Sequence, residues 1–238
     1  ITLHTSPRHR DEFFAAPYVD LWRAFVAAGA DLALHPHEDR ADGGSFFRDP
    51  GHLERVLADR LAHAAALDLP VTAFRAGLFA SRRDLGPLLA RHGLATDLSA
   101  LPGAAVPEKA IAWPESLATA QPLPADLDVP AAPATDVLEI PIGWRGAGSD
   151  LDADYLFNER MDLDGLIRVW DGIRAARPPR CVNFLCHGFG LVEPRWRDQT
   201  RRFLDHARAH GATLVSPATA RIRHLPPFPA RGPIRGAA

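Results

Sequence analysis

Lysine is almost missing from this sequence of 238 residues: Lys109 is the only one, and the other basic side chains are arginines and histidines. The Lys and Arg residues do not gather into one run, and the formal net charge is −2. Nucleic acids and anionic membrane surfaces are usually bound by a dense basic patch. The sequence therefore argues against either of them as the main partner.

Cysteine and long apolar runs are also scarce. Cys181 and Cys186 are the two cysteines, and they lie five residues apart in a strand-like run, so a disulfide between them is not expected. No apolar run approaches the roughly 20 residues of a membrane-spanning helix, and no signal peptide pattern is present. The chain begins with Ile1 inside an apolar run, so we expect further sequence upstream and assign no cellular compartment.

What the sequence does contain is a regular alternation of short apolar runs and amphipathic patterns over its first 100 residues. Strands are expected at 1–7, 31–35 and 70–77, and helices at 18–30, 52–67 and 83–93. Parallel strands need crossover connections, which helices usually supply. This order therefore predicts a parallel sheet with helices packed outside it.

The second half repeats the alternation after one interruption. Residues 101–135 hold seven prolines and few periodic apolar positions, which predicts a long loop or a loose, partly extended excursion. Order is then expected to return, with strands at 136–144, 180–189 and 212–217 and helices at 161–176 and 197–211. The sequence predicts a single α/β domain over 1–222, built as a distorted (β/α) barrel, and a Pro/Gly/Arg-rich tail at 223–238.

Side chains that can bind a metal ion, carry charge or transfer a proton follow four of the expected strands. In parallel α/β folds functional groups gather at the carboxyl ends of strands. Three of the four ends carry histidine, which a chance scatter of 11 histidines would rarely produce. The residues at these ends are His4; His35, His37, Glu38 and Asp39; Arg75; and His187.

Two readings are open for the His-rich turn. His35 and either His37 or Asp39 could close on one divalent ion, because imidazole and carboxylate suit zinc and similar metals. The alternative is a solvated polar loop that follows a strand. The choice between His37 and Asp39 stays open at this point.

Arg75 and His187 also each have two readings. Arg75 is either a surface arginine paired with an acid or a fixed cation that orients a catalytic carboxylate. His187 ends the most apolar expected strand, so it is either a core histidine or a general acid or base.

The order of these motifs resembles that of the polysaccharide deacetylase family (NodB-type, carbohydrate esterase family 4). The resemblance spans residues 29–218. GADLALHPHED at 29–39 resembles the family's metal-binding turn, TAFRAG at 72–77 its arginine turn, and RHGLATDLS at 91–99 a later element. LEIP at 138–141 and LCH at 185–187 complete the series.

The resemblance implies roles for these residues. His35 would be the first metal ligand, and the second is left between His37 and Asp39. Arg75 would brace the catalytic base, and His187 would be the general acid for the leaving amine. Trp144, Phe189 and His4 are candidates for contacts with substrate.

One departure from the family concerns the catalytic base. The family carries an Asp-Asp pair on its first strand, whereas ITLHTSP at 1–7 looks like the second strand. Either the first strand is missing from this chain or the base has been lost. The implied function is a metal-dependent, zinc-type deacetylase of N-acetylated saccharides. The alternatives are a catalytically degenerate carbohydrate-binding member and a hydrolase of another small amide.

Overall fold

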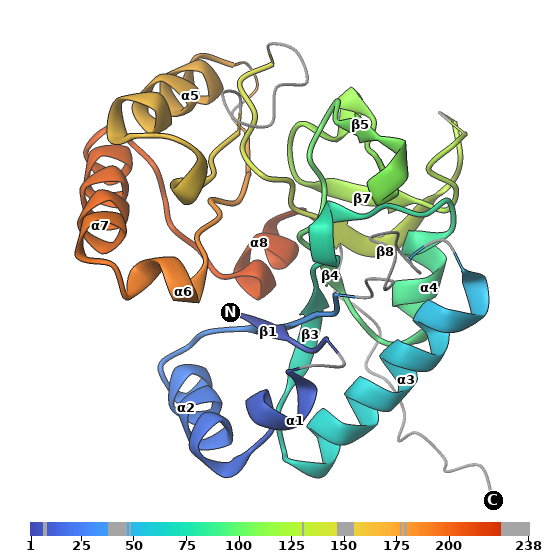
Figure 1. Cartoon of the computed structure of the whole chain (residues 1–238). Helices are drawn as coiled ribbons and strands as arrows, with labels where there is room; N and C mark the ends of the chain where they lie inside the picture. The colour runs from blue at the N-terminus through green and yellow to red at the C-terminus, as the bar shows by residue number, and fades with distance from the viewer. Residues whose placement is uncertain are drawn as a thin grey trace, which may run out of the picture.

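A mixed sheet of six strands forms the centre of the computed structural model, which describes residues 1–6, 9–37, 47, 49–129, 131–146, 155–176, 178 and 180–224. The order across the sheet is β1-β2-β3-β4-β8-β7 (Figure 1). Neighbouring strands are parallel except β7 and β8. The strands are β1 (Thr2–His4), β2 (Leu32–His35), β3 (Val71–Phe74), β4 (Thr96–Asp97), β7 (Gln121–Pro124) and β8 (Ala134–Glu139).

Helices connect most of the parallel strands, as the sequence predicts. They are α1 (Arg10–Phe13), α2 (Ala16–Ala27), α3 (Pro50–Ala66), α4 (Leu85–Arg91), α5 (Leu163–Ala175), α6 (Gly188–Leu191), α7 (Pro194–Ala209) and α8 (Pro217–His224). The start of α3 shows why the chain turns helical there. The Asp49 side chain accepts hydrogen bonds from the first free N–H groups, and Pro50 fits the first helical turn.

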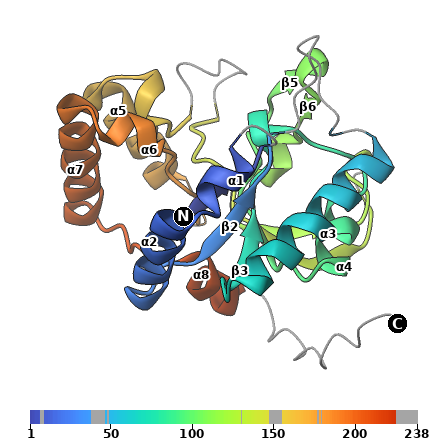
Figure 2. The ribbon, with the colours of Figure 1, turned by 60° about the horizontal axis from the view of Figure 1, so that its bottom comes forward.

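Helices cover both faces of the sheet. Figures 1 and 2 show α3 and α4 on one side of the central strands and α8 on the other. Small side chains on the second face, Ala33 and Ala73, allow Ala220 of α8 to join their apolar cluster. In the described part of the chain, no helix has the length and apolar character needed to cross a bilayer.

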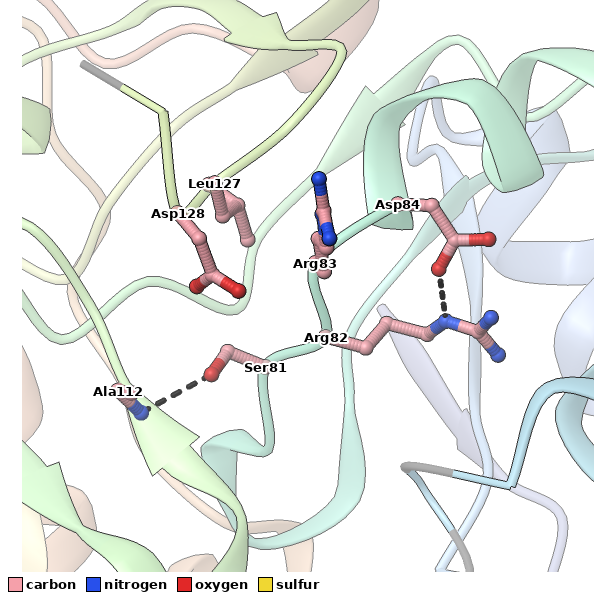
Figure 3. A pocket seen from close by; sticks show the side chains of 7 residues that line it. All are labelled: Ser81, Arg82, Arg83, Asp84, Ala112, Leu127 and Asp128. Atoms are coloured by element: carbon pink, nitrogen blue, oxygen red, sulfur yellow. Dashed lines mark hydrogen bonds and ion pairs between the residues drawn. The ribbon is translucent and has the colours of Figure 1, made fainter.

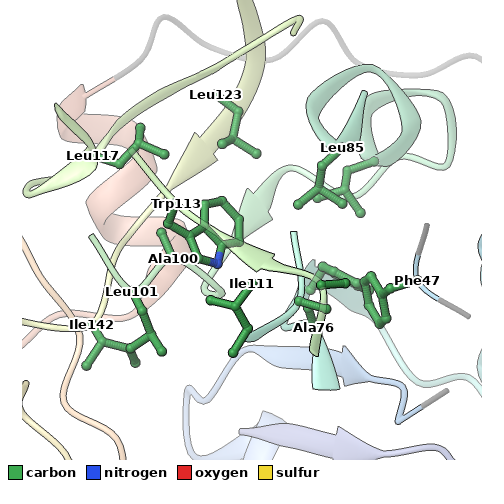
Figure 4. Close-up of a cluster of buried hydrophobic side chains, with 14 of the residues drawn as sticks. Phe47, Ala76, Leu85, Ala100, Leu101, Ile111, Trp113, Leu117, Leu123 and Ile142 are labelled. Carbon is green, nitrogen blue, oxygen red and sulfur yellow. The ribbon is translucent and has the colours of Figure 1, made fainter. Parts of the chain in front are cut away.

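The proline-rich segment 101–135 carries short regular elements within the predicted loop or excursion. It contains β7 and a small antiparallel hairpin of β5 (Ala105–Val106) and β6 (Ile111–Ala112). Figure 4 shows Ile111 and Trp113 within the main core, and the Trp113 indole donates a hydrogen bond to the Phe79 carbonyl at 2.7 Å. The prolines disrupt periodicity, yet each short strand still buries apolar side chains.

The carboxyl-terminal third also differs from the prediction. Residues 212–217 form no strand, and the chain enters α8 instead. Residues 180–189 contribute only isolated parallel bridges, at Asn183 with Ile142 and at Leu185 with Phe157. The predicted tail overlaps the end of α8, and residues 225–238 lie outside the described part.

The fold class is therefore confirmed as α/β with a mostly parallel central sheet. Strand pairs in the described residues do not close into a ring, so the barrel stays an expectation. β2 has β1 on one side and β3 on the other. The strand beside β2 at the outer end of this sheet is thus the one that carries His4.

Candidate functional site

Three predicted histidines lie together at the ends of β1 and β2. His4 and His35 are paired in register across the two strands, and His37 follows two residues later. The ring centroids are 5.7 Å apart for His4 and His35, 4.6 Å for His4 and His37, and 4.7 Å for His35 and His37. We call these three residues the imidazole cluster. Asp39, the alternative second ligand, lies outside the described residues.

The orientation of His35 is fixed by the neighbouring strand. Its Nδ1 lies 2.9 Å from the Arg75 carbonyl oxygen, which can only accept, so Nδ1 carries the hydrogen. Burial, followed by the nearby His37 ring, lowers the pKa of His35 well below its usual 6.5. A neutral ring protonated on Nδ1 has its lone pair on Nε2, which lies 3.1 Å from Nε2 of His37.

This arrangement suits two ligands of one ion. Two imidazoles bound to a tetrahedral zinc at about 2.0–2.1 Å have their nitrogens roughly 3.3 Å apart. A bond from the second ring nitrogen to a backbone carbonyl is typical of metal-bound histidine. As the side chains stand, however, no three His, Cys, Asp or Glu residues of the described segments are arranged to hold a metal ion.

The turn after β3 packs tightly on the His37 backbone. Gly77, which begins the short helix η2 (Gly77–Phe79), donates its N–H to the Pro36 carbonyl at 2.9 Å. A Cβ on Gly77 would lie 2.5 Å from that oxygen and 2.8 Å from the His37 Cα. Glycine is therefore required there by contact with the His-rich turn.

Arg75 is buried, so it is not a surface arginine. Its Nη2 donates to Asn183 Oδ1 at 2.9 Å, whereas Nε and Nη1 are buried and have no hydrogen-bond partner among the described residues. Burial lowers the pKa of Arg75 to about 10, against the opposing effect of Glu139 and Asp97. The guanidinium is still charged at neutral pH.

The two carboxyl groups near Arg75 form a buried pair at the ends of β4 and β8. Asp97 and Glu139 are register partners. Asp97 Oδ1 accepts from the Leu98 N–H at 2.8 Å and from the Ser99 hydroxyl, and Glu139 Oε1 accepts from the Ala100 N–H at 2.9 Å. Burial raises the pKa of both acids, and the Asp97 charge raises that of Glu139 further. We infer that the pair shares one proton.

This shared proton makes stability depend on pH in a defined direction. In the unfolded chain both acids ionise above about pH 4.5, whereas the folded pair keeps a proton because the pKa of Glu139 is raised. The free energy of unfolding should therefore fall as pH rises from the unfolded pKa through the folded one. Glu139→Gln mimics the protonated acid, so its unfolding free energy should change less with pH.

Urea unfolding between pH 5 and 9 measures this effect. Glu108→Gln is the control, because Glu108 is exposed and has no buried acid as a partner in the described segments. Equal pH dependence in the parent protein and Glu139→Gln would show that the pair holds no extra proton.

His187 is held by a carboxylate that the sequence reasoning missed. Glu159, in the short helix η5 (Asn158–Arg160), accepts a hydrogen bond from the His187 N–H at 2.7 Å. Its other oxygen lies 3.4 Å from His187 Nδ1. Burial acts to raise the pKa of Glu159, but hydrogen bonds from His187 outweigh it and lower that pKa. The His187 side chain is 33% exposed, so it is not a core histidine.

Aromatic contacts and one hydrogen bond connect the His187–Glu159 pair with the residues that follow β3. The Phe157 ring contacts His187 at 5.4 Å and Phe79 at 6.0 Å, and Phe79 follows Gly77 in η2. The bond from Arg75 to Asn183 ties β3 to the segment that ends at His187.

The three candidates for substrate contact have different surroundings. Trp144 is 5% exposed and belongs to the main core, which leaves little of its ring for a ligand. Phe189 is 73% exposed and stacks on His187 with centroids 4.8 Å apart. His4 belongs to the imidazole cluster.

A separate cavity of about 550 Å³ lies elsewhere on the fold (Figure 3). Arg82 there is held to Asp84 by a bond of 2.6 Å from its Nε. None of the predicted site residues lines this cavity, whose lining is Ser81, Arg82, Arg83, Asp84, Ala112, Leu127 and Asp128.

The similarity of this chain to known proteins is one of fold alone. No protein-family model matches the sequence, and no curated protein matches it at a significant level. Among solved structures, a protein of Mycobacterium smegmatis named as a polysaccharide deacetylase has a TM-score of 0.58 and 13% sequence identity. The match covers 96% of this chain and 74% of that one. The chain therefore shares the mixed α/β fold with a mostly parallel sheet.

Proposed function

We propose that this protein is a metal-dependent hydrolase that removes the acetyl group from an N-acetylated sugar or polysaccharide. The observation that carries the proposal is the close approach of His35 Nε2 and His37 Nε2, which lie 3.1 Å apart after β2. His187, which Glu159 holds, supplies a proton donor on the segment that Asn183 ties to Arg75. The fold similarity and the order of sequence motifs support the same reading. We also propose that the sheet belongs to a distorted (β/α) barrel of the deacetylase type.

A divalent ion, expected to be Zn²⁺, would be held by His35 and His37, whose Nε2 atoms are suitably spaced. When bound, such an ion supplies polarisation of the acetamide carbonyl and a more acidic water. Asp39 remains a candidate for a further ligand. His35 itself needs no deprotonation to bind, because its lowered pKa keeps it neutral.

His187 would act as the general acid for the departing amine. Glu159 accepts from the His187 backbone N–H and lies near Nδ1, which orients the ring and leaves Nε2 for proton transfer. Phe189 beside it presents a largely exposed ring face on which a sugar could stack.

One observation favours the second candidate function, a carbohydrate-binding protein without catalysis. The strand beside β2 ends at His4 and is followed by Thr5, so no carboxylate base comes from that position. A third candidate is hydrolysis of another small amide on the same residues.

Acetate release from N-acetylated saccharides by the zinc-loaded protein separates these candidates. Release that is lost in His187→Asn supports the proposed deacetylase. Saccharide binding without acetate release supports the binding protein, and turnover restricted to small non-sugar amides supports the third candidate.

Metal content tests the ligand pair directly. His35→Ala is expected to abolish tight zinc binding, because loss of one of few protein ligands leaves a site too weak to compete with buffer. Zinc is measured on dialysed protein by elemental analysis. Comparing His37→Ala with Asp39→Ala assigns the second ligand, since only a true ligand matches the His35→Ala effect. Equal zinc content in His35→Ala and the parent would remove His35 from the site.

A further inference from the structure

The short helix η5, which carries Glu159, is tied to the segment that ends at His187. Its first residue, Asn158, is fully buried. The Asn158 N–H donates to the Leu185 carbonyl at 2.8 Å, two residues before His187. The position of the Glu159 carboxylate beside His187 therefore depends on hydrogen bonds made by other residues of η5.

Helix α7 also holds η5. Gln199 of α7 donates from Nε2 to Asn158 O at 2.9 Å, to Asn158 Oδ1 at 3.1 Å and to Met161 O at 3.0 Å. Asn158 Nδ2 donates in turn to the Trp196 carbonyl at 3.3 Å. Trp196 and Gln199 are three residues apart, so both face η5 from one side of α7. Carbonyl groups at the end of a short helix need donors from outside it, and Gln199 supplies them.

Helix α6, which directly precedes α7 (Figure 1), sets the position of the carboxylate itself. A Cβ on Gly190 of α6 would lie 2.5 Å from Glu159 Oε1 and 3.2 Å from Glu159 Cγ and Cδ. This Oε1 is the atom that accepts the His187 N–H at 2.7 Å. Any side chain at position 190 would therefore push the carboxylate away from that hydrogen bond.

We propose that Gln199 and Gly190 are positioning residues for His187, because Gln199 fixes η5 against α7 and Gly190 leaves room for the Glu159 carboxylate. Both act through Glu159 and not on the substrate. The inference rests on the role of His187 as the general acid in the proposed function.

The exposure of His187 makes such positioning necessary. Its side chain is 33% exposed, so packing alone does not fix the ring, whereas the Glu159 side chain that faces Nδ1 is 13% exposed. A general acid has to point its proton at the leaving group, and a misplacement of about 1 Å can lower a rate by roughly 100-fold. Residues that hold Glu159 in place should therefore affect turnover.

Gly190→Ala separates position from stability. Alanine is favoured over glycine within a helix, and the Oε1 atom that the new Cβ meets is at the end of a flexible side chain, so the Tm should not fall. The kcat for acetate release by the zinc-loaded protein should nevertheless fall by roughly 10-fold or more, with KM within about twofold of the parent. Gly188→Ala is the matched control, because a Cβ there meets nothing within 4 Å.

Gln199→Met tests the contact with α7. Methionine has nearly the same length as glutamine but no N–H donor, so kcat should again fall by roughly 10-fold with KM little changed. Gln121→Met is the matched control, because Gln121 of β7 also donates to a backbone carbonyl, that of Ser116. Melting curves show which variants are folded, and Gly190→Ala carries the test if Gln199→Met does not fold.

Amide hydrogen exchange measures the position of Glu159 without any substrate. The His187 N–H should exchange roughly 10-fold faster in Gly190→Ala and Gln199→Met than in the parent, because its bond to Glu159 is weakened. The Arg75 N–H, which donates to the Leu34 carbonyl at 2.8 Å within the sheet, should exchange as in the parent.

Two results would overturn the inference. One is unchanged exchange of the His187 N–H in both folded variants. The other is faster exchange with the kcat of the parent in Gly190→Ala, and loss of acetate release in His187→Asn would then leave the proposed function standing. Absence of acetate release by the parent would contradict the proposed function, and the exchange rates would still decide whether the two residues position His187.

Discussion

Replacing His187 by Asn is expected to lower the rate of acetate release by about 100-fold or more, because Asn cannot donate the proton that the leaving amine needs. Fold and zinc content should be unchanged, since the side chain is partly exposed and its backbone N–H still reaches Glu159. The loss should be smaller for substrates whose leaving amine is less basic. Turnover, thermal melting and zinc content are measured on the same sample.

Glu159→Gln provides the positioning test for the same histidine. The amide side chain would keep the shape and the bond to the His187 backbone but lose the carboxylate that faces the His187 ring. Turnover of this variant should fall. His210→Asn, at the end of α7, controls for a histidine replaced elsewhere. A large melting shift in His187→Asn with unchanged turnover per folded molecule would make His187 structural.

Arg75→Met is expected to lower the free energy of unfolding by about 3–5 kcal/mol, because it leaves the buried Asp97 and Glu139 pair without its compensating cation. The pair carries one negative charge if it shares one proton, and the Arg75 guanidinium balances that charge. Loss of Arg75 also leaves Asn183 Oδ1 without its donor. Urea unfolding at pH 7 measures the loss.

A second substitution separates charge from packing. In Arg75→Met with Asp97→Asn, the remaining Glu139 can be neutral, so part of the lost stability should return. Arg75→Lys keeps the charge but not the planar geometry and should fall between the parent protein and Arg75→Met. No recovery in the double variant would show that the buried charges are not balanced against Arg75.

The elements that have a clear hydrophobic periodicity were predicted closely. β2, β3 and α3 lie within one or two residues of the predicted bounds at most ends, because each combines an apolar pattern with a clear stop. The strand at 212–217 was wrong because its apolar run is short and Leu214 remains exposed. The small strands of the proline-rich segment 101–135 were not predicted, because their burial depends on packing against the main core and not on a local hydrophobic pattern.

The candidate site could be predicted only where its functional side chains directly follow a strand. The positions of His4, His35 and His37 follow from parallel strands that end at one edge. Glu159 reaches His187 across 28 positions, and Asn183 reaches Arg75 across 108. Such partners are brought together by tertiary packing, so the local spacing of residues does not predict them. The LEIP and TDLS runs did show acids inside apolar strands, which was a usable signal for a buried pair.

The close contact at Gly77 gives the site a mechanical property. The turn after β3 has no room to slide over the Pro36–His37 backbone, because even one added carbon would overlap it. The same turn follows directly from Arg75, whose carbonyl oxygen holds the ring of His35. A side chain at position 77 would therefore push on the backbone of His37, whose ring faces that of His35 across 3.1 Å. A change as small as Gly77→Ala should disturb the spacing of the two histidines without replacing either of them.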